Sequence, residues 1–302
     1  MLTLLVFFSM RLLPGDPIII YVGQSQGVIG MDPAALDKLR AEYGLDKPIM
    51  VQYFHWIGGI FHGDLGKSIT SHDDVSKLLL KRFPITIYIG VITFIIATIL
   101  GTLGGMFAAL RQGKLGDQII TPLSYIGITI PIFWLGVLMI YAFGLKLHWL
   151  PTSGYTSPFK DFALSTRQLV MPVICGAITQ IAMLSRQMRS SVLEVVRQDY
   201  IRTAWSKGLN ERIIVLKHTL KNSLIPVITL MGFAIGGIFG GSVLVESVFN
   251  IPGMGRLMVT SIFAQDYTVV QACTLIFAII VLVSNLAVDM SYGWLDPRIR
   301  YG

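Results

Sequence analysis

Charged side chains are scarce in this sequence. Asp, Glu, Lys and Arg together make up 14% of the 302 residues, whereas hydrophobic residues make up 53%. The mean hydropathy is +0.67. Since an average soluble domain carries about 25% charged residues, this composition excludes an ordinary soluble domain and indicates an integral membrane protein.

Cysteine and histidine are also few, and their positions do not suggest catalysis or metal binding. The two cysteines, Cys175 and Cys273, both fall inside apolar runs, which favours buried thiols over a disulfide framework. The five histidines lie outside or at the edges of the apolar runs, in no metal-ligand pair on a helix face. They are His55, His62, His72, His148 and His218. We therefore expect no catalytic residues, no metal site and no cofactor in this chain.

One fragment, Gly66-Lys67-Ser68, is reminiscent of a nucleotide-binding phosphate loop. That motif requires another glycine five residues before Gly66, and this chain has Phe61 there. We therefore expect no ATP site. The formal net charge of +7 comes from cations clustered in loops beside apolar runs, as the positive-inside rule predicts, so we also expect no nucleic acid partner.

The apolar runs predict an all-α membrane protein with six transmembrane helices, the first one incomplete. Residues 1–13 would rise about 20 Å against a hydrocarbon core of about 30 Å, so we expect the sequence to start inside that helix. Pro122 and Pro131 are expected to bend the second complete span. The complete spans are predicted at residues 86–110, 118–145, 169–185, 224–245 and 269–290.

Polar segments separate these spans. Residues 14–83 predict an extracytoplasmic subdomain with a short helix over 34–43 that Gly44 ends. Residues 148–167 predict an outer loop. A further outer loop, residues 246–267, contains the turn signal Asn250-Ile251-Pro252-Gly253, and its apolar residues suggest a partly re-entrant gate.

Small residues recur every four positions in two of the spans. Ala97, Gly101, Gly105 and Ala109 form one stripe, and glycines at 232, 236 and 240 form another. Such stripes most often allow two helices to pack closely, although glycine also lets packed helices slide.

A basic stretch, residues 186–221, lies between the third and fourth complete spans. Ser191 and Glu194 have the spacing of a capping box. Further on, helical spacing places an apolar set on one face, with Arg197, Arg202 and Lys207 toward the other. The apolar set is Tyr200, Ile201, Ala204, Trp205 and Leu209.

The end of this basic stretch predicts a second helix. Gly208 would stop the first helix, Asn210 would cap the next one, and Glu211 suits its first turn. The pattern thus predicts a short helix, a sharp turn and a helix returning toward Pro226.

Three interpretations of the short helix remain open. Cations gather in any cytoplasmic loop and set topology. A basic helix also binds anionic lipid surfaces. Alternatively, the helix is a docking site for a soluble partner, because Trp205 and Tyr200 lie beside cations and these residue types anchor interfaces.

Motifs along the whole chain resemble the permeases of ABC importers, in particular the dipeptide, oligopeptide and nickel branch. Arg202-Thr203-Ala204 stands where the broad permease signature has Glu-Ala-Ala, and Leu220-Lys221 where it has Leu-Pro, changes that this branch tolerates. The motifs are Pro14-Gly15-Asp16-Pro17, Tyr43-Gly44-Leu45-Asp46, Gly63-Asp64-Leu65-Gly66, Tyr200-Ile201-Arg202-Thr203-Ala204, Lys207-Gly208-Leu209, residues 217–226, residues 249–255 and residues 295–300.

The resemblance implies a permease domain over residues 84–302, half of the translocation pathway, coupled to ATPases that bind ATP and Mg. Implied partners are a second homologous permease subunit, two cytoplasmic ABC ATPase subunits, an extracytoplasmic substrate-binding protein and membrane lipid. It also implies the inner membrane of a prokaryote, with both termini cytoplasmic. The ATPase-coupling residues would be Asp199, Tyr200, Arg202, Thr203, Ala204, Trp205, Lys207, Gly208 and Leu209.

The solute is less defined. A di- or oligopeptide is the default of this branch, and nickel or a metal chelate is the alternative. A secondary transporter or channel is a more distant alternative, since few ionisable groups lie within the spans. Polar residues that could line a pathway or gate are Gln180, Ser242, Glu246, Asn250 and Asn285, and interhelical hydrogen bonds would explain them equally well.

Overall fold

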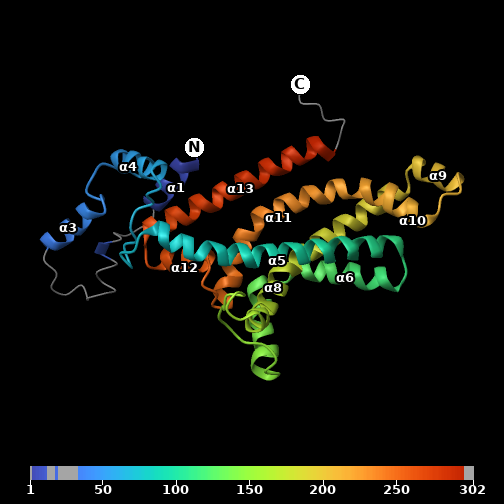
Figure 1. The fold of residues 1–302 in the computed structure, drawn as a ribbon, viewed down its shortest axis with the longest axis horizontal. Coiled ribbons are helices and arrows are strands. Elements are labelled where there is room, and N and C mark those ends of the chain that lie inside the picture. Colours follow the sequence, from blue (N-terminus) through green and yellow to red (C-terminus); the bar gives the residue numbers. More distant parts are fainter. Residues whose placement is uncertain (1, 12–17, 20–32, 296–302) are drawn as a thin grey trace. The chain divides into compact units, whose positions relative to one another are not determined.

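The computed structural model describes residues 2–11, 18–19 and 33–295, and this part of the chain is helical (Figure 1). Its only β pairing is an isolated bridge between Lys67 and Asp74. Two compact units are present. Unit 1 comprises Met1–Ile87 and Pro252–Ile280, and unit 2 comprises Tyr88–Ile251 and Val281–Gly302. The predicted all-α class is confirmed.

Long apolar helices account for most of the described chain. Four helical stretches are long and apolar enough to cross a membrane, and a bent pair of helices makes a fifth if it counts as one span. The described residues therefore contain four or five candidate spans where the sequence predicted six. The four are α5 (Val75–Leu110), α8 (Phe162–Val196), the stretch Glu211–Gly237 and the stretch Tyr267–Ala287.

The ends of these helices differ from the ends of the predicted apolar spans. A helix begins and ends where its residues stop favouring helix or a cap is present, and not where the apolar run stops. α5 begins at Val75 and takes in the last residues of the predicted 14–83 segment. α8 begins at Phe162, where Asp161 accepts a hydrogen bond from the Leu164 backbone and caps the helix. It contains Pro172 and Gly176, and after Gly176 it runs on to Val196 through a sequence with no glycine or proline.

The predicted capping box is therefore wrong. Ser191 lies inside α8, where its hydroxyl accepts a hydrogen bond from the Gln187 amide, and Glu194 is also within the helix. Capping-box spacing alone does not start a helix when the residues before it are already helical.

The second predicted span, 118–145, is a broken one. α6 (Leu115–Thr129) is followed by α7 (Ile132–Met139) and the π-helix η1 (Ile140–Lys146), with a bend of 104° between α6 and the pair α7–η1. Proline disfavours helical geometry in the residue before it. Accordingly, Ile130 is extended with ψ 124°, and Pro131 caps α7. Pro122 produces no break and lies inside α6.

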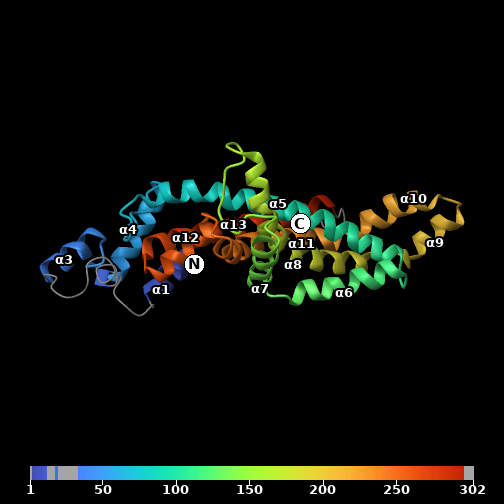
Figure 2. The ribbon, with the colours of Figure 1, turned by 90° about the horizontal axis from the view of Figure 1, so that it is seen from below.

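In unit 2, α8 packs against α5, α6 and α11 (Leu220–Val248), and Figure 2 shows α6 running alongside it. Ala97, Gly101, Gly105 and Ala109 of α5 are all buried. A Cβ on Gly101 would come within 2.7 Å of the Leu184 Cβ on α8. The prediction that this stripe serves close helix packing is confirmed.

The second glycine stripe is partly in contact. A Cβ on Gly236 of α11 would lie 3.4 Å from Val281 of α13 (Tyr267–Leu295), which is ordinary van der Waals contact. A Cβ on Gly237 would meet nothing within 4 Å. The side chain position at 240 lies outside the described residues. α11 therefore has a contact face and an open face side by side.

Unit 1 contains α1 (Leu2–Arg11), α3 (Pro33–Glu42), α4 (Ile49–Phe61), α12 (Met254–Phe263) and the beginnings of α5 and α13. α3 matches the predicted helix, and Gly44 follows it with φ 65°. α4 was not predicted. α12 lies within the predicted outer loop 246–267, and the turn signal before it is confirmed by Asn250, whose φ is 55°.

Asp266 fastens a loop of unit 1 to the start of α13. This carboxylate is buried and accepts hydrogen bonds from the Ser68 hydroxyl at 2.5 Å and the Thr70 backbone at 3.2 Å. Its other oxygen accepts from the Val269 backbone, as a helix cap does. The segment from 68 to 70 and the N-terminus of α13 are thereby held together.

The α5–α8 contact yields the first prediction. Gly105→Ala places a methyl group onto the Ser185 carbonyl, so overpacking should lower the free energy of unfolding by about 1–3 kcal/mol. Gly104→Ala is the matched control, since its Cβ would lie 3.6 Å from the Ser185 hydroxyl. Thermal unfolding in nanodiscs compares the two. Equal melting temperatures would contradict the proposed close contact.

Candidate functional site

The short helix of the basic stretch is α9 (Asp199–Ser206), which follows α8. Gly208 ends it in the left-handed region with φ 72°, a conformation that favours glycine. The Asn210 side chain then accepts a hydrogen bond from the Arg212 backbone and caps α10 (Glu211–Ile213). The chain continues from α10 through η2 (Ile214–Thr219) into α11 (Figure 1). The predicted helix, turn and returning helix are confirmed.

The apolar face of α9 divides into a buried stripe and an exposed flank. Ile201 and Ala204 are buried in a cluster with Ile214, and Val195 at the end of α8 packs against it. Only this part of the apolar face of α9 is therefore buried against the rest of the protein. The exposed flank of α9 comprises Tyr200 and Trp205 of the helix and Leu209 just after Gly208, and these residues are exposed by 44%, 47% and 39%.

The polar residues of α9 are held loosely. Arg202 and Asp199 lie 3.5 Å apart with side chains exposed by 70% and 96%, so this ion pair contributes little stability. Thr203 and Ser206 only donate to backbone carbonyls of their own helix. Lys207, at the C-terminal end of α9, is exposed. These side chains are therefore available to a partner.

One hydrogen bond ties the exposed flank to the returning helix. The Asn222 amide of α11 donates to the Tyr200 hydroxyl at 3.0 Å and also to the His218 carbonyl at 2.8 Å. Tyr200 is therefore oriented by α11, although its ring remains half exposed.

A cavity of about 310 Å³ lies within unit 2 between α5, α7, α8 and α11. Its walls are mostly apolar, with a few polar side chains, among them Gln180 of α8 and Ser242 of α11. The Gln180 Oε1 atom is buried and has no hydrogen-bond donor in the described part of the chain. Two of the predicted pathway residues are thus brought to one cavity.

The other predicted pathway residues do not line this cavity. Glu246 is fully buried on α11, Asn250 lies in the turn after that helix, and Asn285 is exposed on α13. These three residues lie on two different helices and in a turn, and their polarity alone does not show which of them faces a cavity. Their role in a pathway stays a prediction.

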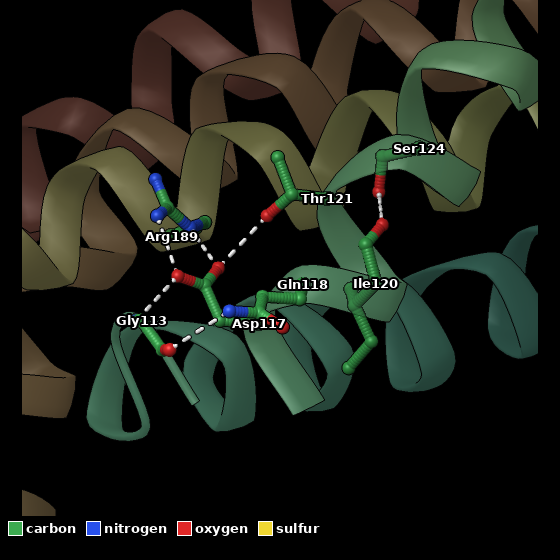
Figure 3. Close-up of polar contacts among 7 residues, drawn as sticks. All are labelled: Gly113, Asp117, Gln118, Ile120, Thr121, Ser124 and Arg189. Atoms are coloured by element: carbon green, nitrogen blue, oxygen red, sulfur yellow. Dashed lines mark hydrogen bonds and ion pairs between the residues drawn. The ribbon is translucent and has the colours of Figure 1, made fainter. Parts of the chain in front are cut away.

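A buried carboxylate that the sequence analysis did not single out connects α6 to α8 (Figure 3). The side chain of Asp117 is 8% exposed, and its carboxylate accepts hydrogen bonds from the Nε and Nη2 atoms of Arg189 at 2.6 and 2.9 Å. It also accepts from the Gly113 backbone at 2.9 Å and the Thr121 hydroxyl at 2.8 Å. A bidentate pair with two further donors fixes both geometry and charge, so the loop before α6 is anchored to the same helix that leads into α9.

The described residues contain no group of three or more His, Cys, Asp or Glu side chains arranged to hold a metal ion. Both cysteines are buried free thiols, and the Cys175 thiol donates to the Ile132 carbonyl at 3.1 Å. The chemistry present in unit 2 is therefore that of an apolar cavity with a few hydrogen-bonding groups, joined to a short exposed helix.

Comparison with known proteins assigns the family. Residues 101–301 match the binding-protein-dependent transport system inner membrane component, and residues 1–90 match the N-terminal region of such membrane components. The chain belongs to this family, the permease subunits of ABC importers. The resemblance to its dipeptide, oligopeptide and nickel branch is confirmed.

Individual relatives agree with this assignment. A Brucella ovis protein provisionally named a peptide permease is 38% identical over 302 residues, covering 99% of this chain and 94% of the relative. The di/tripeptide transport system permease protein DppB of Pseudomonas aeruginosa is 36% identical over 319 residues, covering 99% and 94%. Among solved structures, a chain of the MetNI methionine ABC transporter has a TM-score of 0.59 at 16% identity, covering 72% of this chain and 96% of that one. It shares the fold.

The seating of α9 can be tested through its buried stripe. Ile201→Ala removes packing against Ile214 and Val195 and should lower the free energy of local unfolding of α9 by about 2–5 kcal/mol. Hydrogen exchange of the α9 amides measures this value. Arg202→Ala, at an exposed position of the same helix, should leave exchange nearly unchanged. Similar exchange in both variants would show that α9 is not held by its buried stripe.

The Asp117–Arg189 pair gives a third prediction. Arg189→Met leaves a buried carboxylate without its cation and should cost about 3 kcal/mol of unfolding free energy. The double variant Asp117→Leu with Arg189→Met replaces the pair by apolar contacts and should recover part of that loss. Chemical unfolding in lipid nanodiscs measures both. If Asp117→Leu lowers the stability of the Arg189→Met variant by as much as it lowers that of the wild-type chain, the two side chains are not coupled.

Proposed function

We propose that this chain forms half of the membrane pathway of an ATP-driven importer and that α9 docks onto a cytoplasmic ATPase. The observation that carries this proposal is the division of α9. Ile201 and Ala204 hold the helix to η2 and α8, while Tyr200, Trp205 and Leu209 face outward. Aromatic side chains on a rigid support are what a protein interface uses as anchors.

The route from α9 to the cavity supports the coupling role. Val195 of α8 packs on the α9 cluster, and Ile214 within it belongs to η2, which continues into α11. α8 and α11 both line the unit 2 cavity, through Gln180 and Ser242 among others. A movement of α9 would therefore be passed to two cavity walls, so that ATP binding could favour one of two packings of the bundle.

A short peptide is the proposed solute, because the named relatives are peptide permeases and the chain is similar to them over 99% of its length. The proposed assembly has a second homologous permease subunit, two cytoplasmic ATPase subunits that bind ATP and Mg, and an extracytoplasmic substrate-binding protein. The chain would reside in the inner membrane of a prokaryote with both termini in the cytoplasm. On this orientation α9 lies on the same side as the ATPases.

If α9 were a lipid-binding helix, its exposed flank would have to be apolar and continuous. A helix lying on lipid turns one continuous apolar face toward the bilayer. Here Ile201 and Ala204, which form the centre of that face, are already buried against the protein. The remaining flank suits a protein partner better than a membrane surface.

The docking role predicts the effect of changing Trp205. Trp205→Glu should reduce copurification of ATPase subunits with the chain at least tenfold and abolish stimulated ATPase activity, while membrane insertion is retained. The reason is that losing a central aromatic anchor typically costs about 2 kcal/mol or more of binding free energy. Trp149→Glu is the matched control, since Trp149 is also exposed but lies in the loop between η1 and α8.

The outcomes separate the interpretations. Normal ATPase association in the Trp205→Glu variant would overturn the docking role. Gly208→Pro provides a second variant, because proline cannot adopt the φ of 72° that Gly208 has at the end of α9. A wild-type chain that copurifies with no ATPase, and whose transport follows an ion gradient regardless of ATP, would place it among secondary carriers.

A further inference from the structure

A second cavity, of about 480 Å³, lies within unit 1. Its walls come from α1, α4, the segment around residues 41–47, the segment 64–74 and the first turn of α13. The volume falls in the range of small-molecule sites, about 300–1,000 Å³. The mechanism proposed for unit 2 makes no use of this cavity.

Three nitrogen donors among the lining residues are buried and have no acceptor in the described part of the chain. They are Arg11 Nη1, Trp56 Nε1 and Gln271 Nε2. The Gln271 side chain is almost completely buried, with 3% exposure. A buried N–H group without an acceptor is unfavourable, so three in one place indicate a site built for an acceptor that enters from outside.

The three donors belong to one cluster. The Arg11 guanidinium carbon lies 4.7 Å from the centre of the Phe7 ring and 5.6 Å from that of Tyr267. The Phe7 and Trp56 ring centres are 5.7 Å apart. Gln271 is one helical turn beyond Tyr267 on α13. The three residues therefore reach one cavity from α1, α4 and α13.

Arg11 is held in place by hydrogen bonds. Its Nε and Nη2 atoms donate to the Gln52 Oε1 atom at 3.1 and 2.8 Å, which fixes the plane of the guanidinium. No carboxylate of the described residues forms an ion pair with it. A positioned cation with a spare N–H, beside two neutral N–H donors, matches the two acceptor-only oxygens of a carboxylate.

Charges of both signs line the rest of the cavity. Lys47 and Lys67 are present, and so are Glu42, Asp64 and Asp74. The hydrogen bond from Lys77 holds the pKa of Asp74 below its ordinary value, so this carboxyl is ionised. A ligand with a carboxylate at one end and an ammonium group at the other suits such a cavity better than a simple anion.

We propose that unit 1 binds a small zwitterionic solute, with Arg11, Trp56 and Gln271 donating hydrogen bonds to its carboxylate after small side-chain rotations toward the cavity. The choice of a short peptide as that solute rests on the proposed function, whereas the carboxylate chemistry does not. The permease would thus contact the solute at a site other than the unit 2 cavity and select for a free C-terminus.

The test uses the full chain purified in lipid nanodiscs and titrated with Ala-Ala-Ala and with its C-terminal amide. The free acid should bind at least tenfold more tightly than the amide, because hydrogen bonds to a charged acceptor are the strong ones. Gln271→Leu should remove most of that preference. Gln112→Leu is the same substitution in the exposed turn after α5 and should leave the preference intact.

Each outcome bears on the proposal. Equal dissociation constants for acid and amide, no measurable binding of either, or an unchanged preference in a folded Gln271→Leu chain would overturn it. If Gln271→Leu does not fold, Trp56→Phe is the alternative variant, because it keeps an aromatic ring and removes the Nε1 donor. It should weaken binding of the free acid more than binding of the amide.

The failure of this inference can be told apart from failure of the proposed function. Copurification of ATPase subunits with the wild-type and Gln271→Leu chains depends on α9 and not on the unit 1 cavity. If ATPases copurify but the acid and amide bind alike, only the carboxylate site is wrong. If the acid is preferred but no ATPase copurifies, only the importer assignment is wrong.

Discussion

The close approach of α5 to α8 is the constraint on which unit 2 depends. Between membrane-spanning helices there is no water to expel, so association relies on van der Waals contact and hydrogen bonds. Gly101 and Gly105 allow the two backbones to come so near that a methyl group has no room. α8 then has its other sides free for α6 and α11. It becomes the common support of the Asp117 pair, the cavity and α9.

The sequence was most informative where local chemistry is strong. Gly208, Asn210 and the small-residue stripe of α5 predicted a turn, a cap and a contact that the structure contains. Helix ends were less predictable, because the length of an apolar run indicates how much of the chain lies in the membrane and does not indicate where the helix begins or ends. The apolar helix α4 was missed since Pro48 at its start provides no polar capping signal.

Residues of the candidate sites were predicted unevenly for a physical reason. α9 could be found because its amphipathic pattern and stop signal are contained in about ten consecutive residues. The pair of Asp117 and Arg189 and the three donors of unit 1 lie far apart in sequence. No local pattern marks such residues, and only tertiary packing brings them together. The same applies to Glu246, whose complete burial could not be inferred from its position near a predicted span end.

The break at Pro131 bears on how the chain is assembled in the membrane. A continuous helix satisfies its own backbone and can enter lipid alone, whereas a bend of 104° leaves peptide groups beside it without helical partners. Here Cys175 of α8 donates to the Ile132 carbonyl next to the break. α8 therefore lies against α7 beside the break. Because this packing keeps unpaired N–H groups at the start of α7 away from lipid, the final insertion of α6 and α7 should depend on a helix that the ribosome makes later.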